Sequence, residues 1–308
     1  MSPRNPQSSE EKALLKRAQQ YLPGGSTGNF PSAFEEGFIA QKASGSKIYD
    51  YSGNEYIDYL LGSGPMLLGH AHPAVVSAVT EHLARGSTYF LTSEPAIELA
   101  EEICRAVPAA DMVRFTTSGT DATFQCMRVA RAFRRRDKVL KFEGGYHGSH
   151  DYATQSVVPS LLPDFPEPVA GSAGIPKVIQ ETMLVAPFND LETTSEIIAK
   201  HHDELACVIV EPVQRIIPPV PGFLEGLREI TAQYEIPLIF DEVVTGFRLA
   251  YGGAQEYFGV KPDLAAFGKI VGGGFPLAAI CGRSDLMHVY DATAVDEQGF
   301  IPQVGTLS

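Results

Sequence analysis

Residues 112–142 read MVRFTTSGTDATFQCMRVARAFRRRDKVLKF, and this stretch decides the fold class. Its two ends, residues 112–116 and 138–142, are short and rich in Val, Leu and Phe, which is typical of strands buried in a sheet. Residues 120–135 between them have the length and the basic carboxyl end of a helix. Because a strand, a helix and a strand in succession form a parallel βαβ unit, we expect an α/β protein.

The same alternation continues along the rest of the chain. Further strands are predicted at residues 205–210, 237–240, 264–267 and 277–281, and further helices at residues 9–21, 73–85, 94–107 and 222–234. Residues 47–60 carry apolar and aromatic side chains on both sides of a Ser-Gly-Asn turn, which predicts a β-hairpin. The pattern indicates a mostly parallel sheet with helices on both faces.

The composition is that of an acidic, folded protein. Of the 308 residues, 44% are hydrophobic and 20% are charged, and the 29 Gly and 22 Pro are spread among apolar segments, which excludes a disordered chain, collagen and a coiled coil. The formal net charge of −13 would repel a phosphate backbone. We interpret the one basic run, RAFRRRDK at residues 131–138, as the solvated end of a helix, so we expect no nucleic-acid partner.

The four cysteines, Cys104, Cys126, Cys207 and Cys281, are too far apart in the sequence for a zinc motif or a dense disulfide framework. We therefore expect no metal site and a reducing, cytoplasmic location. No stretch approaches the roughly 18 apolar residues of a membrane span, and residues 1–20 are polar, unlike a signal peptide. We expect no membrane partner.

Ligands of an open parallel sheet bind at the carboxyl ends of its strands, so the residues after each predicted strand are candidates for a functional site. Ser118, Gly119 and Thr120 follow the strand at residues 112–116 and begin a helix. Their hydroxyl groups and the N–H groups of the helix start suit a phosphate monoester. Alternatively, a serine at this position is only the N-cap of the helix.

Asp241 and Lys269 each follow a predicted apolar strand. The carboxylate either belongs to a site or caps a turn. A P-loop is excluded around the lysine, because Asp263 stands in place of its first glycine and Ile270 in place of its Ser/Thr. A lysine at a buried strand end can instead have its pKa lowered by desolvation and act as an amine nucleophile.

A phosphate cradle, a buried acid and an amine nucleophile together match one cofactor, pyridoxal 5'-phosphate (PLP). It has a phosphate, a pyridine nitrogen that pairs with a carboxylate, and an aldehyde that forms a Schiff base with lysine. Tyr146, after the strand at residues 138–142, either stacks on the ring of this cofactor or is a packed core tyrosine. We therefore predict PLP as the cofactor.

Several ordered motifs are similar to those of one enzyme family. The chain resembles the class III (subgroup II) aminotransferases of PLP fold type I and, among them, the glutamate-1-semialdehyde 2,1-aminomutase-like branch. The resemblance spans about residues 21–308 and rests on PGG (23–25), LGHAHP (68–73), RFTTSGTDA (114–122), KFEGGYHG (141–148), VEPV (210–213), IFDEVVTGFR (239–248), DLAAFGKIVGGGFPLAAICGR (263–283) and GTLS (305–308).

The resemblance implies catalytic roles for two residues. Lys269 would form the Schiff base with PLP and move the substrate proton, and Asp241 would keep the pyridine nitrogen protonated. Thr306 matches a threonine that reaches the phosphate of the neighbouring subunit, so the resemblance also implies a homodimer.

The remaining cofactor contacts follow from the same resemblance. Ser118, Gly119 and Thr120 would hold the phosphate. Tyr146 would stack on one face of the ring, and Val243 would pack on the other.

The motifs also bear on the reaction. The ornithine and γ-aminobutyrate branches carry glutamine at the position of Val244, which favours the aminomutase-like branch. Aminomutases, however, have a tryptophan just before their GPM segment, whereas this chain has none and reads GSGPM at residues 62–66. We therefore predict transfer of an amino group from an amino acid or amine to a separate carbonyl acceptor. The alternatives are a glutamate-1-semialdehyde 2,1-aminomutase and a truncated or non-catalytic PLP-binding protein.

The resemblance suggests how the chain is divided. Residues 1–65 are expected to be an N-terminal helix and hairpin that form part of a small domain, and residues 66–308 are expected to be the large PLP-binding domain. Members of the family are longer, so we expect the C-terminal small domain to be missing from this chain. The Pro/Gly/Ser-rich residues 156–176 are either a mobile active-site flap or an ordinary surface excursion.

Overall fold

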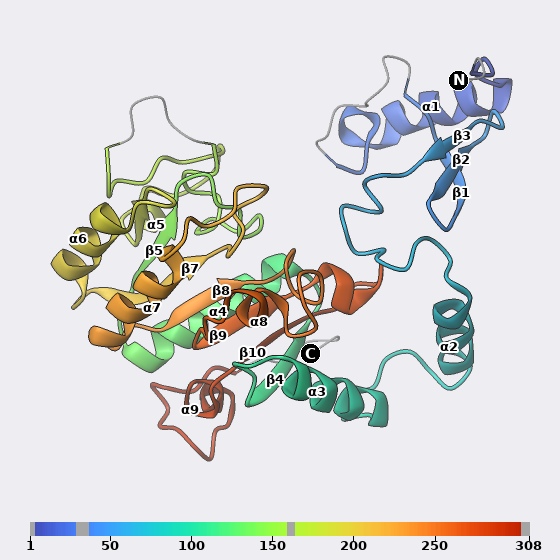
Figure 1. The fold of residues 1–308 in the computed structure, drawn as a ribbon. Coiled ribbons are helices and arrows are strands. Elements are labelled where there is room, and N and C mark those ends of the chain that lie inside the picture. The colour runs from blue at the N-terminus through green and yellow to red at the C-terminus, as the bar shows by residue number, and fades with distance from the viewer. Residues whose placement is uncertain (1–3, 29–36, 159–163, 303–308) are drawn as a thin grey trace. The chain divides into compact units, whose positions relative to one another are not determined.

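In the computed structural model, which describes residues 4–28, 37–158 and 164–302, the chain divides into two units, Met1–Ser87 and Thr88–Ser308. Figure 1 labels their helices and strands. The division of the chain after residue 65 stays a prediction, because the compactness of a segment does not by itself define its role.

A seven-stranded sheet forms the centre of the larger unit. Its strands are β4 (Met112–Thr116), β5 (Lys138–Phe142), β6 (Met183–Ala186), β7 (Leu205–Val210), β8 (Leu238–Asp241), β9 (Leu264–Phe267) and β10 (Ala278–Gly282). Their order across the sheet is β4-β10-β9-β8-β7-β5-β6. All neighbouring pairs are parallel except those of β10, which runs antiparallel to both β4 and β9. The prediction of a mostly parallel sheet is confirmed.

Parallel pairing brings the carboxyl ends of the central strands to one edge. Val210 at the end of β7 pairs with Phe240, and Asp241 at the end of β8 pairs with Ala266. The loops that carry the candidate site residues therefore leave the sheet on the same side.

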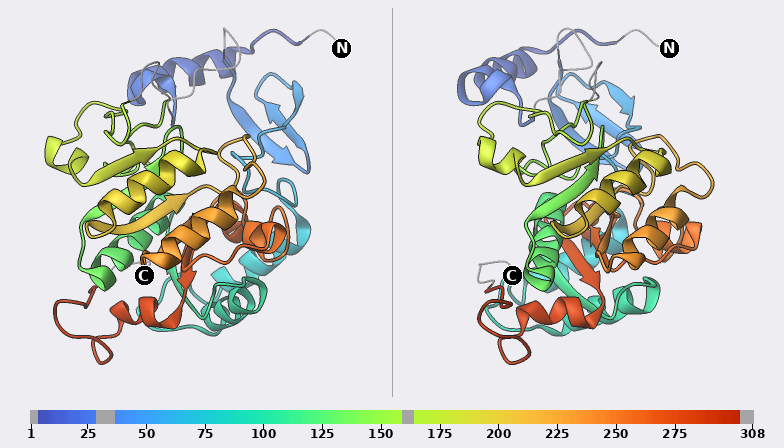
Figure 2. Two further views of the ribbon diagram at one scale, coloured as in Figure 1. Left: turned by 60° about the vertical axis from the view of Figure 1, so that its left-hand side comes forward. Right: turned by 90° about the vertical axis from the view of Figure 1, so that its left-hand side faces the viewer.

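Helices cover both faces of this sheet, as the two views of Figure 2 show. The helices are α3 (Glu94–Ala106), α4 (Gly119–Arg134), α5 (Lys177–Gln180), α6 (Leu191–His201), α7 (Phe223–Gln233), α8 (Gly253–Phe258) and α9 (Ser284–Met287), with 3-10 turns η2 (Lys269–Gly272) and η3 (His288–Tyr290). The apolar side of α4 is buried against one face and that of α7 against the other. Ile103 of α3 packs in a third cluster with Phe267 of β9.

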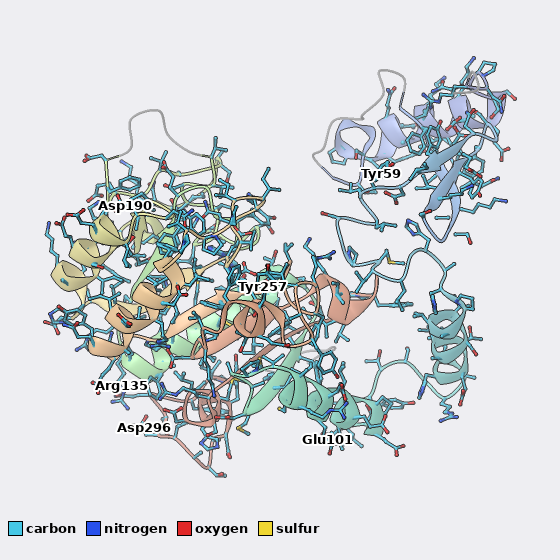
Figure 3. All side chains as sticks on the ribbon, viewed as in Figure 1. Tyr59, Glu101, Arg135, Asp190, Tyr257 and Asp296 are labelled. Carbon is cyan, nitrogen blue, oxygen red and sulfur yellow. The ribbon has the colours of Figure 1, made fainter. Side chains whose placement is uncertain are left out.

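Polar side chains define several helix ends. Asp190 caps α6, because its carboxylate accepts the N–H of Thr193 at 3.0 Å. Arg135 ends α4 in a left-handed conformation with φ 54° and forms an ion pair with Asp296 at 2.7 Å. Figure 3 labels Asp190, Arg135 and Asp296.

The smaller unit contains α1 (Ser9–Tyr21), η1 (Pro23–Gly25), α2 (Pro73–Leu83) and a sheet of β1 (Ala40–Ser44), β2 (Lys47–Asp50) and β3 (Glu55–Ile57). The β2–β3 pair confirms the predicted hairpin. Glu11 of α1 is fully buried and accepts hydrogen bonds from the Ile39 N–H at 2.9 Å and from the Ser52 hydroxyl. This carboxylate ties the helix to the hairpin.

The strands that the sequence predicts are present, but a few details differ. β8 and β10 begin and end one residue later than expected. The Ser8 side chain caps α1 by accepting the Glu11 N–H. The antiparallel direction of β10 was not expected. Only η2 lies between β9 and β10, and a parallel return requires a longer crossover, usually an α-helix.

The elements that were not predicted from the sequence are β1, β6, α5, α6, α8 and α9. The helix α8 is short and glycine-flanked, and tertiary contacts hold it. The buried Glu242 carboxylate accepts the N–H groups of Ala254 at 2.6 Å and of Gln255 at 3.1 Å. Local propensity carries no signal for such a helix.

The Pro/Gly/Ser-rich segment is hydrogen-bonded to residues of the larger unit on both sides of it in the sequence. The Gly171 N–H donates to the Thr154 carbonyl at 2.9 Å, and the Val185 N–H of β6 donates to the Pro166 carbonyl at 2.9 Å. Residues 159–163 lie outside the described part. Of the two alternatives for this segment, these bonds favour an ordinary surface excursion.

Among the helices of residues 4–28, 37–158 and 164–302, none is both long and apolar enough to cross a membrane.

The core of the larger unit makes a direct test of the fold possible. Leu227 of α7 is fully buried against the sheet, so Leu227→Ala should lower the free energy of unfolding by roughly 2–5 kcal/mol. Glu229 of the same helix is exposed, and Glu229→Ala should change it by less than about 0.5 kcal/mol. Urea unfolding followed by circular dichroism measures both. Equal effects would show that α7 does not pack on the sheet through Leu227.

Candidate functional site

The segments that follow β4, β8 and β9 touch one another. A Cβ atom on Gly119 would lie 2.8 Å from Cγ1 of Val243. A Cβ atom on Gly268 would lie 3.2 Å from the same Val243 atom and 3.5 Å from the Gly119 Cα. Only glycine permits this approach at Gly119, since real Cβ atoms do not come this close to a neighbour. The helix start, the acidic turn and the lysine turn therefore form one site.

Asp241 ends β8 with its carboxylate almost fully buried. Oδ1 accepts the Val243 N–H at 3.1 Å, and Oδ2 lies 2.8 Å from Nδ1 of His147. Burial raises the pKa of Asp241, while the Val243 N–H and the positive charge of Lys269 act in the opposite direction. A carboxylate held in this way can receive a cationic N–H group that enters the site.

His147 belongs to this site, although no role was predicted for it from the sequence. Burial and the charge of Lys141 lower the pKa of His147 to about 3, so its imidazole is neutral. We place its proton on Nδ1, because the partner of Nδ1 is a carboxylate. His147 therefore donates to Asp241 and fixes the direction of the carboxylate. The only sequence signal was its place beside Tyr146 in the GGYHG segment.

Lys269 begins η2 directly beyond the end of β9, with a left-handed φ of 46°. Its side chain is half-buried. Burial lowers the pKa of Lys269 and so do the charges of Arg248 and Arg215, whereas the Asp241 carboxylate raises it. A lowered pKa increases the neutral fraction of the amine, which is the nucleophilic form.

The start of α4 has the features expected of an anion cradle. The Ser118 hydroxyl accepts the Asp121 N–H at 3.1 Å, so this side chain does cap the helix. The first N–H groups of α4, those of Gly119 and Thr120, have no acceptor within the helix and remain suited to phosphate oxygens. The positive end of the dipole of α4, a helix of 16 residues, also favours a bound anion here.

A second segment packs on this cradle. The Ser149 N–H donates to the Thr120 hydroxyl at 3.3 Å. A Cβ atom on Gly148, whose φ is 108°, would lie 2.7 Å from the Thr120 Cα. The segment that carries Tyr146 and His147 is thereby placed against the helix start.

Tyr146 lies at the edge of the site and is not a core residue. The residue is 42% exposed, and the Arg215 guanidinium lies 4.8 Å from the ring centroid. Its backbone N–H donates to Oε2 of Glu211, which follows β7, at 2.8 Å. Burial raises the pKa of Glu211. The ring is available to stack on a ligand.

Thr306 lies outside the described residues. Within the described ranges, no group of three or more His, Cys, Asp or Glu side chains is arranged to hold a metal ion.

The residues present are chemically suited to PLP. The cradle of α4 suits its phosphate, the buried carboxylate of Asp241 suits its protonated pyridine nitrogen, and the amine of Lys269 suits its aldehyde. Because position 119 is a glycine, no side chain at this position covers the N–H groups of the cradle. All three features lie on adjoining segments of one sheet edge.

A sequence profile described as "Aminotransferase class-III" matches residues 32–299. The chain belongs to the class-III aminotransferases. This family uses PLP, so the cofactor predicted from the sequence is confirmed at the level of the family, as are the fold class and an enzymatic role.

Curated relatives are similar over almost the whole chain. "Glutamate-1-semialdehyde 2,1-aminomutase" of Methanosphaera stadtmanae is 46% identical over 97% of this chain and 69% of its own length. The protein of the same name from Methanothermobacter thermautotrophicus is 47% identical over 97% of this chain and 70% of its own length. The resemblance to the aminomutase-like branch is confirmed.

Solved structures show the same relationship. An omega-transaminase from Sphaerobacter thermophilus has a TM-score of 0.92 and 39% identity, with 98% of this chain and 69% of that chain covered. A glutamate-1-semialdehyde aminomutase from Pseudomonas aeruginosa has a TM-score of 0.82 and 27% identity, with 96% of this chain and 66% of that chain covered.

The contact between Gly148 and the α4 start can be tested with two matched glycines. Both Gly148 and Gly174 have positive φ, but a Cβ atom on Gly174 would meet nothing within 4 Å. Gly148→Ala should therefore lower the free energy of unfolding by about 1–3 kcal/mol more than Gly174→Ala does. Urea unfolding measures the difference. Equal losses would mean that backbone conformation alone, and not contact with Thr120, requires glycine at position 148.

Proposed function

We propose that this protein is a PLP-dependent aminotransferase that moves an amino group from an amino acid or amine to a carbonyl acceptor, with Lys269 as its Schiff-base lysine. The observation that supports it most strongly is the meeting of three chemical groups at one sheet edge: the cradle of Ser118, Gly119 and Thr120, the buried carboxylate of Asp241 and the amine of Lys269.

Each residue has a defined part in this proposal. When bound, PLP supplies an electron sink for the pair of electrons that remains when the substrate loses its α-proton. Asp241 keeps the pyridine nitrogen protonated, and His147 holds the Asp241 carboxylate in place through its Nδ1–H. Lys269 binds the cofactor and carries the proton, because a lowered pKa increases the fraction of neutral amine that can accept a proton and return it.

Tyr146 and Val243 are proposed to hold the ring of the cofactor from opposite faces. The exposed ring of Tyr146 and the position of Val243 against Gly119 support this arrangement. Thr306 is proposed to reach the phosphate in the neighbouring subunit of a homodimer, and the amino donor and the carbonyl acceptor are then its small-molecule partners.

Two observations favour transfer between two molecules. The omega-transaminase of Sphaerobacter thermophilus is similar over 98% of this chain with a TM-score of 0.92. The chain also has no tryptophan, so the residue that precedes GPM in aminomutases is absent. Transfer within one molecule, by a glutamate-1-semialdehyde 2,1-aminomutase, is the second candidate. The 46% and 47% identity to proteins of that name supports it.

Reduction of the bound cofactor tests the role of Lys269. The protein mixed with PLP should show an absorbance band that sodium borohydride abolishes, because borohydride reduces the C=N bond between lysine and cofactor. Lys269→Ala should lose this band, since no amine remains at that position. Lys261→Ala removes an exposed lysine and should keep it. An unchanged band in Lys269→Ala would assign the cofactor to another lysine.

A screen of amino donors separates the candidate reactions. An aminotransferase should convert the PLP form of the protein to the pyridoxamine form, in proportion to the donor added, as the absorbance spectrum reports. An aminomutase should instead turn glutamate-1-semialdehyde into 5-aminolevulinate without a second substrate. No conversion with any donor, despite a borohydride-sensitive band, would indicate a non-catalytic PLP-binding protein and would contradict the proposed function.

A further inference from the structure

Lys141 is a fully buried lysine that the proposed function does not use. It lies on β5 and has an exposed fraction of 0%. Within the described residues, none of the ion pairs involves Lys141. A buried charge without a carboxylate partner carries a large desolvation cost, so its surroundings must stabilise it in another way.

Backbone carbonyls provide that stabilisation. The Lys141 Nζ donates to the carbonyls of Gly145 at 2.9 Å, of Ala153 at 3.2 Å and of Gln155. An ammonium group has three N–H donors, and here each has an acceptor. Hydrogen bonds to a charged donor are stronger than those between neutral groups.

The three acceptors belong to one segment, residues 144–156, which we name the clamped loop. Gly145 stands near its start, and Ala153 and Gln155 near its end. A further bond from the Gly144 N–H to the Ser156 carbonyl, at 2.8 Å, closes it. The ammonium therefore holds both ends of the loop at one point.

The clamped loop carries two residues that the proposed function uses, Tyr146 beside the cofactor ring and His147 beside Asp241. Tyr146 follows directly after Gly145, and His147 donates to Asp241 at 2.8 Å. Thr123 of α4 also holds the loop, because its hydroxyl donates to the His147 carbonyl. Lys141 and Thr123 thus fix the backbone from the sheet and from the helix.

The charge of Lys141 acts on the same histidine. Burial lowers the pKa of Lys141 to about 7, and the three carbonyls oppose this because they stabilise the charged form. The charged groups that face it are Glu211, which raises its pKa, and Arg215, which lowers it. The positive charge of Lys141 adds to burial in lowering the pKa of His147, and a neutral His147 is the form that donates to Asp241.

We propose that Lys141 is a positioning residue of the cofactor site, whose ammonium group, bound to the carbonyls of Gly145, Ala153 and Gln155, holds Tyr146 and His147 in place for the cofactor. The effect on the cofactor rests on the proposed function, whereas the hydrogen bonds of Lys141 do not depend on it. Lys141 is not a competing Schiff-base lysine, because it is fully buried and all its N–H groups are engaged. Lys269 is half-buried at the strand edge.

Lys141→Met tests the clamp, because methionine keeps much of the side-chain volume and removes the charge and donors. Lys138→Met is the matched control on the same strand, since Lys138 pairs with Glu204 at 2.7 Å, away from the clamped loop. Hydrogen–deuterium exchange of the cofactor-free protein should show amides of residues 144–156 exchanging about tenfold or more faster in Lys141→Met than in the wild type. The control should not differ from the wild type there.

The second measurement concerns the cofactor. The Kd of PLP for Lys141→Met should rise about tenfold or more, as expected for the loss of at least one charge-assisted hydrogen bond, and the visible circular dichroism of the bound PLP should weaken. That dichroism reports the asymmetric surroundings of the ring, which a purely structural role of Lys141 would leave unchanged. The control should change the Kd by less than about twofold.

The outcomes separate the two proposals. Unchanged exchange in a folded Lys141→Met protein would overturn the clamp, and faster exchange with an unchanged Kd would overturn its role for the cofactor. If Lys141→Met does not fold, Lys141→Arg replaces it under the same criteria, because a guanidinium keeps the charge but not the three-way geometry. A wild type that binds no PLP, together with faster exchange in the variant, would reject the proposed function and support the clamp.

Discussion

The close approach of Gly119 and Gly268 to Val243 is the constraint on which the site depends. Parallel strands bring their carboxyl ends to one edge, but loops with bulkier residues would keep the helix start, the acid and the lysine apart. A Cβ atom at position 119 would lie 2.8 Å from Val243. The absence of side chains at positions 119 and 268 thus lets three separate segments come together in one site.

Inside this site, burial is the largest influence on the pKa of Asp241, His147 and Lys269. It raises the pKa of Asp241 and lowers those of His147 and Lys269, so each group is drawn toward its neutral form. Contacts between the groups act against burial. The neutral His147 donates to the Asp241 carboxylate, and the charge of Asp241 raises the pKa of Lys269. A cationic pyridine nitrogen would add a positive charge beside the Asp241 carboxylate and so favour its ionised form.

The two buried lysines show why a lowered pKa does not identify a nucleophile. Burial lowers the pKa of both Lys141 and Lys269. Lys141 gives its N–H groups to three carbonyls within one loop, whereas Lys269 stands beyond the end of β9, on the edge where Asp241 lies. Hydrogen-bond partners and position, more than pKa, distinguish a clamp from a reactive amine.

The sequence by itself determined the strands and helices around residues 112–142, the cofactor and the motif positions of Ser118, Asp241 and Lys269, because these features depend on neighbouring residues. Tertiary structure decided the antiparallel direction of β10, the exposed ring of Tyr146 and the pairing of His147 with Asp241. Those two residues are 94 positions apart, and Lys141 meets its carbonyls only because the loop returns to β5. Partners of this kind follow from where the folded chain places its loops, which local propensity does not encode.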